Sequence, residues 1–248
     1  MSAIGEDSDL DNVTNATTVP DNVSSKSASG AVYVYKRTGS SWAQEAYIKA
    51  ANSASDSQFG YSVSLDGETI VVGAPYEDSD LTTITNGTTA NDNVTSADSG
   101  AVYVYKRTGS TWAQEAYIKA VNSNVGDNFG RSVSIDNDTI VVGSHLEDSS
   151  ETTITNGTTG SSNNDNSASG AVYVFTRNGS GAWAQDAYIK ASNNDVDDSF
   201  GDVVSIDELT LAVGVKLEDS NQTTITNGTA AASSNDDNVS SGAVYVYE

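Results

Sequence analysis

Apolar and polar residues alternate along several short segments of the chain, and this pattern predicts β-strands. Residues 61–65 alternate with period two, and residues 69–72 form a short run rich in β-branched side chains. Residues 100–105 are again β-branched and aromatic, while the more polar residues 112–120 have the character of an outer or edge strand. No segment keeps the 3.6-residue period of an amphipathic helix over a useful length. The pattern therefore predicts an all-β protein.

These strands recur in a repeat of about 70 residues, which four motifs mark along the chain. The motif Ser-Gly-Ala-Val-Tyr-Val-(Tyr/Phe) starts at Ser29, Ser99, Ser169 and Ser241. The motif Trp-Ala-Gln-(Glu/Asp)-Ala-Tyr-Ile-Lys-Ala starts at Trp42, Trp112 and Trp183. Phe-Gly steps start at Phe59, Phe129 and Phe200, and Thr-Thr-Ile-Thr-Asn-Gly-Thr starts at Thr82, Thr152 and Thr223.

Four antiparallel strands in each repeat are typical of a β-propeller blade. We therefore expect propeller-type repeats of four-stranded antiparallel blades, about three blades plus a surplus strand. Residues 1–28 are expected to form an N-terminal loop or partial repeat, and residues 29–248 the propeller repeats. The expected units are about 59–120, 129–191 and 200–248, with strands three and four of a further unit at 29–50. The long connections, from strand two to three and from strand four to the next strand one, should share one face.

Two further features of the repeat predict how the blades pack. Within residues 31–35 the valines point to one side of the strand and the tyrosines to the other, which favours packing between neighbouring blades. A sugar-stacking surface is the alternative interpretation of these aromatic residues. The Asn-Gly pairs at Asn86, Asn156 and Asn227 are typical of hairpin turns, and such tips would project from the loop-rich face as binding fingers, contacts between chains or mobile loops.

The repeat resembles the FG-GAP repeat of integrin α-chains and of many secreted or surface-attached bacterial proteins. The first unit matches best, with Phe59-Gly60 followed by Gly73-Ala74-Pro75, and the resemblance covers the chain from about Ser29 to the end. Later units keep the Phe-Gly step but lose the Gly-Ala-Pro step. The resemblance implies a β-propeller with a role in extracellular adhesion or ligand binding. It does not carry over the family's calcium loops, because turns such as Asp66-Gly67-Glu68 are too short to encircle an ion.

The strand count does not amount to a closed ring. Propellers have about 4–8 blades, and three blades should not close. The chain is a fragment, or several chains pool their blades into one ring, or chains join head to tail into a filament through unpaired end strands. Residues 1–7 show no secretory leader, and we expect that a leader is missing from this chain.

Acidic clusters follow the second strand of each unit, and Asp56, Asp127 and Asp198 lie on the same face just before the Phe-Gly steps. Calcium takes about 6–8 oxygen ligands, which two adjacent loops could supply. The alternative interpretation is a solvated acidic surface, or Asp and Ser acting only as turn formers. The predicted calcium ligands are Glu77, Asp78, Asp80, Asp127, Glu147, Asp148, Asp198, Glu218 and Asp219.

Charge and composition narrow the range of functions. The 248 residues include 34 Asp and Glu but only 11 Lys and Arg, giving a net charge of −23, which argues against a nucleic-acid partner. The chain has no cysteine, and no apolar run is long enough to insert into a membrane. An enzyme is disfavoured, because the single histidine, His145, occurs in one unit only and no carboxylate pair is distinguished by the repeats.

Two hypotheses remain, and both place the protein outside the cell or at its surface. The first is a non-enzymatic adhesion or binding module, with a protein or glycan ligand on the acidic loop face that carries positive charge or is bridged by a metal. The second is a self-assembling structural protein whose partner is a copy of itself.

Overall fold

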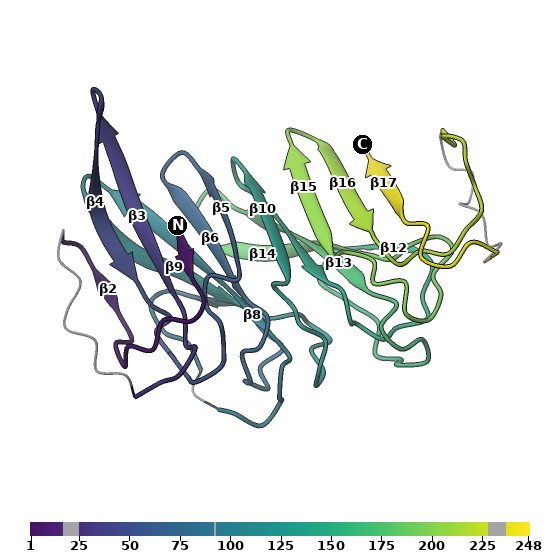
Figure 1. Ribbon diagram of the computed structural model, residues 1–248, viewed down its shortest axis with the longest axis horizontal. Helices are drawn as coiled ribbons and strands as arrows, with labels where there is room; N and C mark the ends of the chain where they lie inside the picture. The colour runs from purple at the N-terminus through teal and green to yellow at the C-terminus, as the bar shows by residue number, and fades with distance from the viewer. Residues whose placement is uncertain (17–24, 92, 228–236) are drawn as a thin grey trace.

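The computed structural model describes residues 1–16, 25–91, 93–227 and 237–248. Every regular element in these residues is a β-strand, and the strands form four antiparallel sheets that follow one another in chain order (Figure 1). The all-β prediction of about three blades plus a surplus strand is therefore confirmed. We call the sheets blades one to four. The described residues include no helix that could cross a membrane.

Blades two and three share a five-stranded plan. Blade two has the order β5 (Ser62–Asp66), β6 (Thr69–Ala74), β8 (Ala101–Thr108), β9 (Thr111–Ile118) and β7 (Thr85–Asn86). Blade three has the order β10 (Ser132–Asp136), β11 (Thr139–Ser144), β13 (Ala171–Arg177), β14 (Trp183–Ile189) and β12 (Ile154–Asn156). The first four strands in each order are those that the sequence predicts, and the fifth is a short edge strand that it does not.

The two end blades are less complete within the described residues. Blade one has the order β1 (Ser2–Ala3), β3 (Ala31–Thr38), β4 (Ser41–Ile48) and β2 (Val13–Thr14). Blade four has the order β15 (Val203–Asp207), β16 (Thr210–Val215) and β17 (Ala243–Tyr247). Among the described strands, blade one therefore has no counterpart of β5, and blade four has none of β9.

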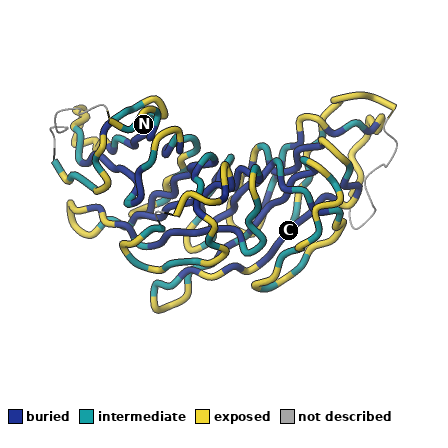
Figure 2. The backbone as a smooth tube through the Cα atoms, turned by 90° about the horizontal axis from the view of Figure 1, so that it is seen from below, coloured by how far each residue is buried: buried dark blue, intermediate teal, exposed yellow. Residues whose placement is uncertain are grey.

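Each pair of neighbouring blades shares a hydrophobic core made from two different faces. Val32 and Val34 of blade one belong to the same buried cluster as Phe59, Tyr103 and Tyr105 of blade two. Equivalent clusters join blades two and three and blades three and four. The predicted packing between blades is confirmed: a valine face of one blade covers the aromatic face of the next. Figure 2 shows the buried positions concentrated along the strands and the exposed ones mainly in the loops.

Serine side chains tie the first strands of successive blades together. The backbone N–H of Ile135 in β10 donates to Ser64 Oγ in β5, at 3.1 Å. The backbone N–H of Ile206 in β15 donates to Ser134 Oγ in β10, also at 3.1 Å. The polar positions of the alternating first strand therefore satisfy backbone donors of the following blade.

Glycine allows the blades to approach closely at the start of the third strand. Gly100 has φ 83°, and a Cβ built there would lie 2.1 Å from the carbonyl oxygen of Phe129 in the Phe-Gly step of the next blade. Gly170 stands in the same relation to Phe200. Any side chain would therefore collide with backbone, which explains the pairing of the Ser-Gly and Phe-Gly motifs.

The long connections gather on one side of the molecule, which we call the loop face. It comprises the connections after second strands, such as residues 75–100, and those after fourth strands, such as residues 119–131. In Figure 1 these loops occupy the lower part of the view. The loop face carries all the sequence-predicted calcium ligands.

Candidate functional site

The acidic loops and the ends of the fourth strands meet in a buried ionic network that repeats from blade to blade. In blade two, Lys119 follows β9 and its Nζ donates to Glu77 Oε2 at 2.9 Å and to Ser99 Oγ at 2.8 Å. In blade three, Lys190 Nζ donates to Glu147 Oε2 at 2.8 Å. Lys49 and Glu6 form the corresponding pair in blade one, at 2.9 Å. All three lysine side chains are fully buried.

The glutamate of each network is satisfied on its other oxygen as well. Glu77 Oε1 accepts the hydroxyl of Tyr117 at 2.9 Å and the amide of Asn52 at 2.8 Å. Tyr103 donates in turn to Asn52 Oδ1 at 2.5 Å. Ser79 completes the network through hydrogen bonds with Glu77 and Tyr117. A buried charge pair is tolerated only when its remaining lone pairs and protons are bonded, and this network meets that condition.

Burial dominates the electrostatics of these groups. It lowers the pKa of the Lys119 and Lys190 ammonium groups, and the charges of Glu77 and Glu147 oppose that shift. Burial likewise raises the pKa of Tyr117 and Tyr188 far above the ordinary value for a phenol, so both hydroxyls are donors to the glutamates. The network therefore holds blade and loop together.

The aspartates next to these glutamates cap a tight turn. Asp78 Oδ1 accepts the backbone N–H of Asp98 at 2.9 Å, and Asp148 Oδ1 accepts that of Ala168 at 2.7 Å. Asp219 Oδ1 accepts the N–H of Ser240 in the same way. The residues that donate all have positive φ, so each aspartate stabilises a left-handed turn before the Ser-Gly motif.

Three other predicted ligands also have protein partners. Asp80 accepts the amide of Asn93 at 2.8 Å and the hydroxyl of Thr95 at 2.9 Å. Asp127 Oδ2 accepts the backbone N–H of Asn124, and Asp198 Oδ2 accepts that of Asp195. Burial is the main cause that raises the pKa of Asp127 to about 8 and that of Asp198 to about 7. Both therefore favour the protonated form at mildly acidic pH.

These contacts bear on whether the loops fit a calcium ion. Calcium needs several oxygens directed at one point. Among the described residues, no three acidic or histidine side chains come together closely enough to hold a metal. The carboxylates of Glu77 and Glu147 already accept hydrogen bonds from lysines. Those of Asp78 and Asp148 accept hydrogen bonds from backbone N–H groups. Calcium stays a prediction, which melting temperatures in calcium and in chelator would test.

The Asn-Gly segments of blades two and three lie differently from the hairpin tips that the sequence predicts, and the third pair, at Asn227, extends outside the described residues. Thr85 and Asn86 form β7, which runs antiparallel to the edge of β9. The Asn86 side chain then reaches blade three, where Oδ1 accepts the N–H of Trp183 at 2.8 Å and Nδ2 donates to its carbonyl at 3.3 Å. Asn15 makes the same two hydrogen bonds to the backbone of Trp112, and we call this pair of bonds a clasp. The hairpin prediction is wrong here because pairing with an exposed strand edge competes with a local turn.

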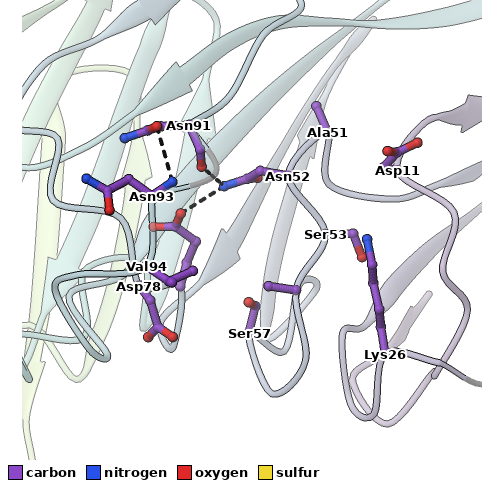
Figure 3. Close-up of a pocket in the computed structure, with 12 residues that line it drawn as sticks. Asp11, Lys26, Ala51, Asn52, Ser53, Ser57, Asp78, Asn91, Asn93 and Val94 are labelled. Carbon is purple, nitrogen blue, oxygen red and sulfur yellow. Dashed lines mark hydrogen bonds between the residues drawn. The ribbon is translucent and has the colours of Figure 1, made fainter.

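A polar cleft of about 200 Å³ opens on the loop face between blades one and two. Nine of its twelve lining residues are polar or charged, which favours a hydrophilic ligand. Figure 3 shows Asp11, Lys26 and Ser53 on one side, Asp78 and Asn93 on the other, and the Asn52 amide between them. The lining residues are Asp11, Lys26, Ala51, Asn52, Ser53, Ala54, Ser57, Glu77, Asp78, Asn91, Asn93 and Val94.

The surroundings of the single histidine keep its ring in the neutral form. His145 is buried, and its Nδ1 makes no hydrogen bond in the described part of the chain. Burial, assisted by the charge of Arg131, lowers its pKa to about 4, so the ring is neutral at physiological pH.

Sequence reasoning missed the lysines at the ends of the fourth strands. The signal was present: Lys49, Lys119 and Lys190 recur at one motif position in a chain with only 11 basic residues. A lysine at a strand end is ordinarily solvated, so its repetition alone does not reveal a buried partner.

Comparison with known proteins agrees with the repeat architecture. A model of the FG-GAP repeat family matches residues 42–105 and, in a second copy, residues 112–175. A search of curated proteins found no match. Because the two matched segments together span just over half of the 248 residues, this protein belongs to the FG-GAP repeat family.

Proposed function

We propose that this chain is a non-enzymatic binding or adhesion module that acts outside the cell and holds a protein or glycan ligand on its loop face. The FG-GAP family relationship supports this assignment, because such propeller-like repeats occur typically in extracellular or surface proteins. The observation that carries the proposal is the polar cleft between blades one and two.

Hydrogen bonds fix the inner wall of the cleft, and polar side chains stand at its rim. Asn52 is fixed by its bond to Glu77 at 2.8 Å and by a second bond to the carbonyl of Asn91 at 2.6 Å. Asp11 and Asn93 stand at the exposed rim. A preorganised polar cleft loses little entropy when it binds a polar group, which favours recognition of an amine or hydroxyl-rich ligand.

Charge indicates which polar ligands are favoured. The net charge of −23 produces a negative field that draws cationic partners and raises their association rate at low salt. Lysine side chains of a protein and amino groups of a glycan share this chemistry. We therefore expect a ligand with an exposed amine, and weaker binding as ionic strength rises.

The test is a binding measurement by biolayer interferometry on the immobilised chain. The probes are a lysine-rich peptide, a glucosamine oligosaccharide with free amines, and its N-acetylated form as the neutral counterpart. The double variant Asp11→Asn, Asn93→Ala alters the cleft rim. The variant Asp165→Asn is the matched control, because Asp165 is an exposed acidic residue on the loops of blade three.

We expect at least one amine-bearing probe to bind, and the rim variant to weaken that binding while the control does not. The proposal is wrong if neither amine-bearing probe binds. It is also wrong if the rim variant and the control bind equally well, because the ligand would then be held elsewhere.

A second candidate function, head-to-tail assembly of copies, has its own supporting observation. Trp42 on the aromatic face of blade one is 67% exposed, whereas Trp112 and Trp183, its counterparts in blades two and three, are 3% and 2% exposed. On the valine face of blade four, Val244 and Val246 are 70% and 60% exposed. These faces are of the two kinds that pack together inside the molecule.

Light scattering over a range of protein concentrations tests this candidate. Assembly predicts a mass that rises above 25.7 kDa with concentration and that Trp42→Gln keeps at the monomer value. Val125→Gln, at an exposed apolar loop residue away from both faces, is the control and should assemble like the wild type. A constant monomer mass for the wild type would exclude the candidate.

A further inference from the structure

In the described part of blade four, the repeated network has its carboxylate but no lysine at the position of Lys119 and Lys190. Glu218 occupies the position of Glu77 and Glu147 and is only 2% exposed. Its Oε1 accepts the amide of Asn193 at 2.8 Å, as Glu77 Oε1 accepts that of Asn52. Its Oε2 has no hydrogen-bond partner among the described residues, whereas Oε2 of the other two glutamates binds a lysine.

The second partner of the ammonium group is also in place. Ser99 Oγ in blade two donates to the carbonyl of Ser79 at 2.9 Å and accepts from Lys119 at 2.8 Å. In blade four, Ser241 Oγ donates to the carbonyl of Ser220 at 2.7 Å. An acceptor pair of carboxylate and hydroxyl is therefore built, and a buried carboxylate without a counter-charge is energetically costly.

In blade four, the sheet edge that pairs with the lysine-bearing strand in the other blades is unpaired among the described residues. β8 pairs with β9 through Val102 opposite Ile118, one residue before Lys119. β17 pairs with β16 on one side only and is the edge of its three-stranded sheet. Val244 is the counterpart of Val102, so an antiparallel strand with isoleucine opposite Val244 would bring its next residue to Glu218.

We propose that the edge of β17, together with Glu218 and Ser241, is a binding site for an extended strand that carries the pattern Ala-Tyr-Ile-Lys. The backbone of the strand extends the sheet, and the lysine ammonium group donates to Glu218 Oε2 and Ser241 Oγ. The tyrosine hydroxyl donates to Glu218 Oε1, as Tyr117 and Tyr188 do to their glutamates. Edge pairing supplies affinity and the buried ion pair supplies selectivity.

The lysine should be required for binding. A lysine ammonium is compact and has three donors, which suits a place bounded by one carboxylate oxygen and one hydroxyl. A methionine at the same position would fit by volume but would leave Glu218 buried and unpaired. The site therefore selects a lysine at this one position, whereas the rest of the strand binds mainly through its backbone.

A synthetic peptide with the sequence of residues 110–121 provides the probe, because it contains the strand that fills this place in blade two. Its binding to the full chain is measured by fluorescence anisotropy with a labelled peptide. A second peptide replaces the lysine by methionine, and a third has a scrambled order. Glu218→Gln alters the site, and Glu208→Gln, in the exposed turn of the same blade, is the charge-matched control.

We expect saturable binding of the first peptide, with roughly 30-fold or greater loss for the methionine peptide and for Glu218→Gln. The Glu208→Gln variant should bind like the wild type. The melting temperatures of both variants establish that they are folded. Absence of saturable binding overturns the proposal, as does equal binding of the lysine and methionine peptides. This outcome is independent of the cleft between blades one and two.

Discussion

The ammonium group of Lys119 lies 2.9 Å from the carboxylate of Glu77, and both side chains are buried. The lysine belongs to the end of the fourth strand, and the glutamate to the loop after the second strand. The pair therefore fixes the loop face to the sheet in blade two, and Lys190 with Glu147 does so in blade three. The stability of the loops depends on these pairs as well as on apolar packing.

Replacing Lys119 by methionine should destabilise the protein by about 3–5 kcal/mol, because Glu77 is left as an uncompensated buried charge. Urea unfolding followed by tryptophan fluorescence measures the effect. Lys36→Met is the control, since Lys36 is exposed and lies 3.9 Å from Glu45, and it should cost less than about 1 kcal/mol. Equal effects of the two substitutions would contradict a structural role for the buried pair.

The clasp between Asn86 and Trp183 predicts a difference between two copies of one motif. Asn86→Ala removes both hydrogen bonds and leaves the Trp183 N–H unsatisfied, at a cost of about 1–3 kcal/mol. Asn156 occupies the same motif position in blade three and makes no such bond to a tryptophan backbone in the described part of the chain. Asn156→Ala should therefore cost less than about 0.5 kcal/mol. If urea unfolding gave equal losses of unfolding free energy for Asn86→Ala and Asn156→Ala, the hydrogen bonds from Asn86 to the next blade would not be the source of the stability.

Close approach of the blades at Gly100 predicts that alanine is not tolerated there. Gly100 and Gly242 have similar positive φ values, 83° and 75°, so the backbone strain of an alanine is similar at both. Only at Gly100 would the new Cβ lie within 2.1 Å of Phe129 backbone, whereas at Gly242 the nearest atom is 3.4 Å away. Gly100→Ala should therefore lower Tm far more than Gly242→Ala. Similar Tm values for the two variants would mean that the blades can move apart at Gly100 without loss of stability.

Much of the fold could be predicted from the sequence, because the strand period and the repeated motifs can both be recognised within short stretches of residues. The alternation at Val32 to Tyr35 gave the two packing faces correctly, since side chains of a strand point to opposite sides. The short strands β7 and β12 could not be predicted, because Thr, Asn and Gly are also typical of turns. Their partner is the edge of β9 or β14, which only the assembled blade presents.

The site was harder to predict than the fold, because it depends on which charges meet. Acidic residues after each second strand gave the right location, but the lysines that engage Glu77 and Glu147 come from about 40 residues further along the chain. The same difficulty applies to Glu218. Its unpaired oxygen is evident only by comparison with the two complete networks.

The raised pKa of Asp127 predicts how one substitution changes stability with pH. Burial is the main cause of the shift from 3.8 to about 8, so between these values the folded protein keeps a proton that the unfolded chain releases. The stability that protonated Asp127 contributes is therefore complete below about pH 4 and is lost as pH rises toward 8.

Asp127→Asn removes the titration while its Oδ1 can still accept the N–H of Asn124. The variant should melt close to wild type at pH 4 and at least about 2–4 °C higher at pH 8. Asp197→Asn, at an exposed aspartate, is the matched control for the loss of one acidic side chain. A pH-independent Tm difference for Asp127→Asn would contradict the predicted protonation of Asp127.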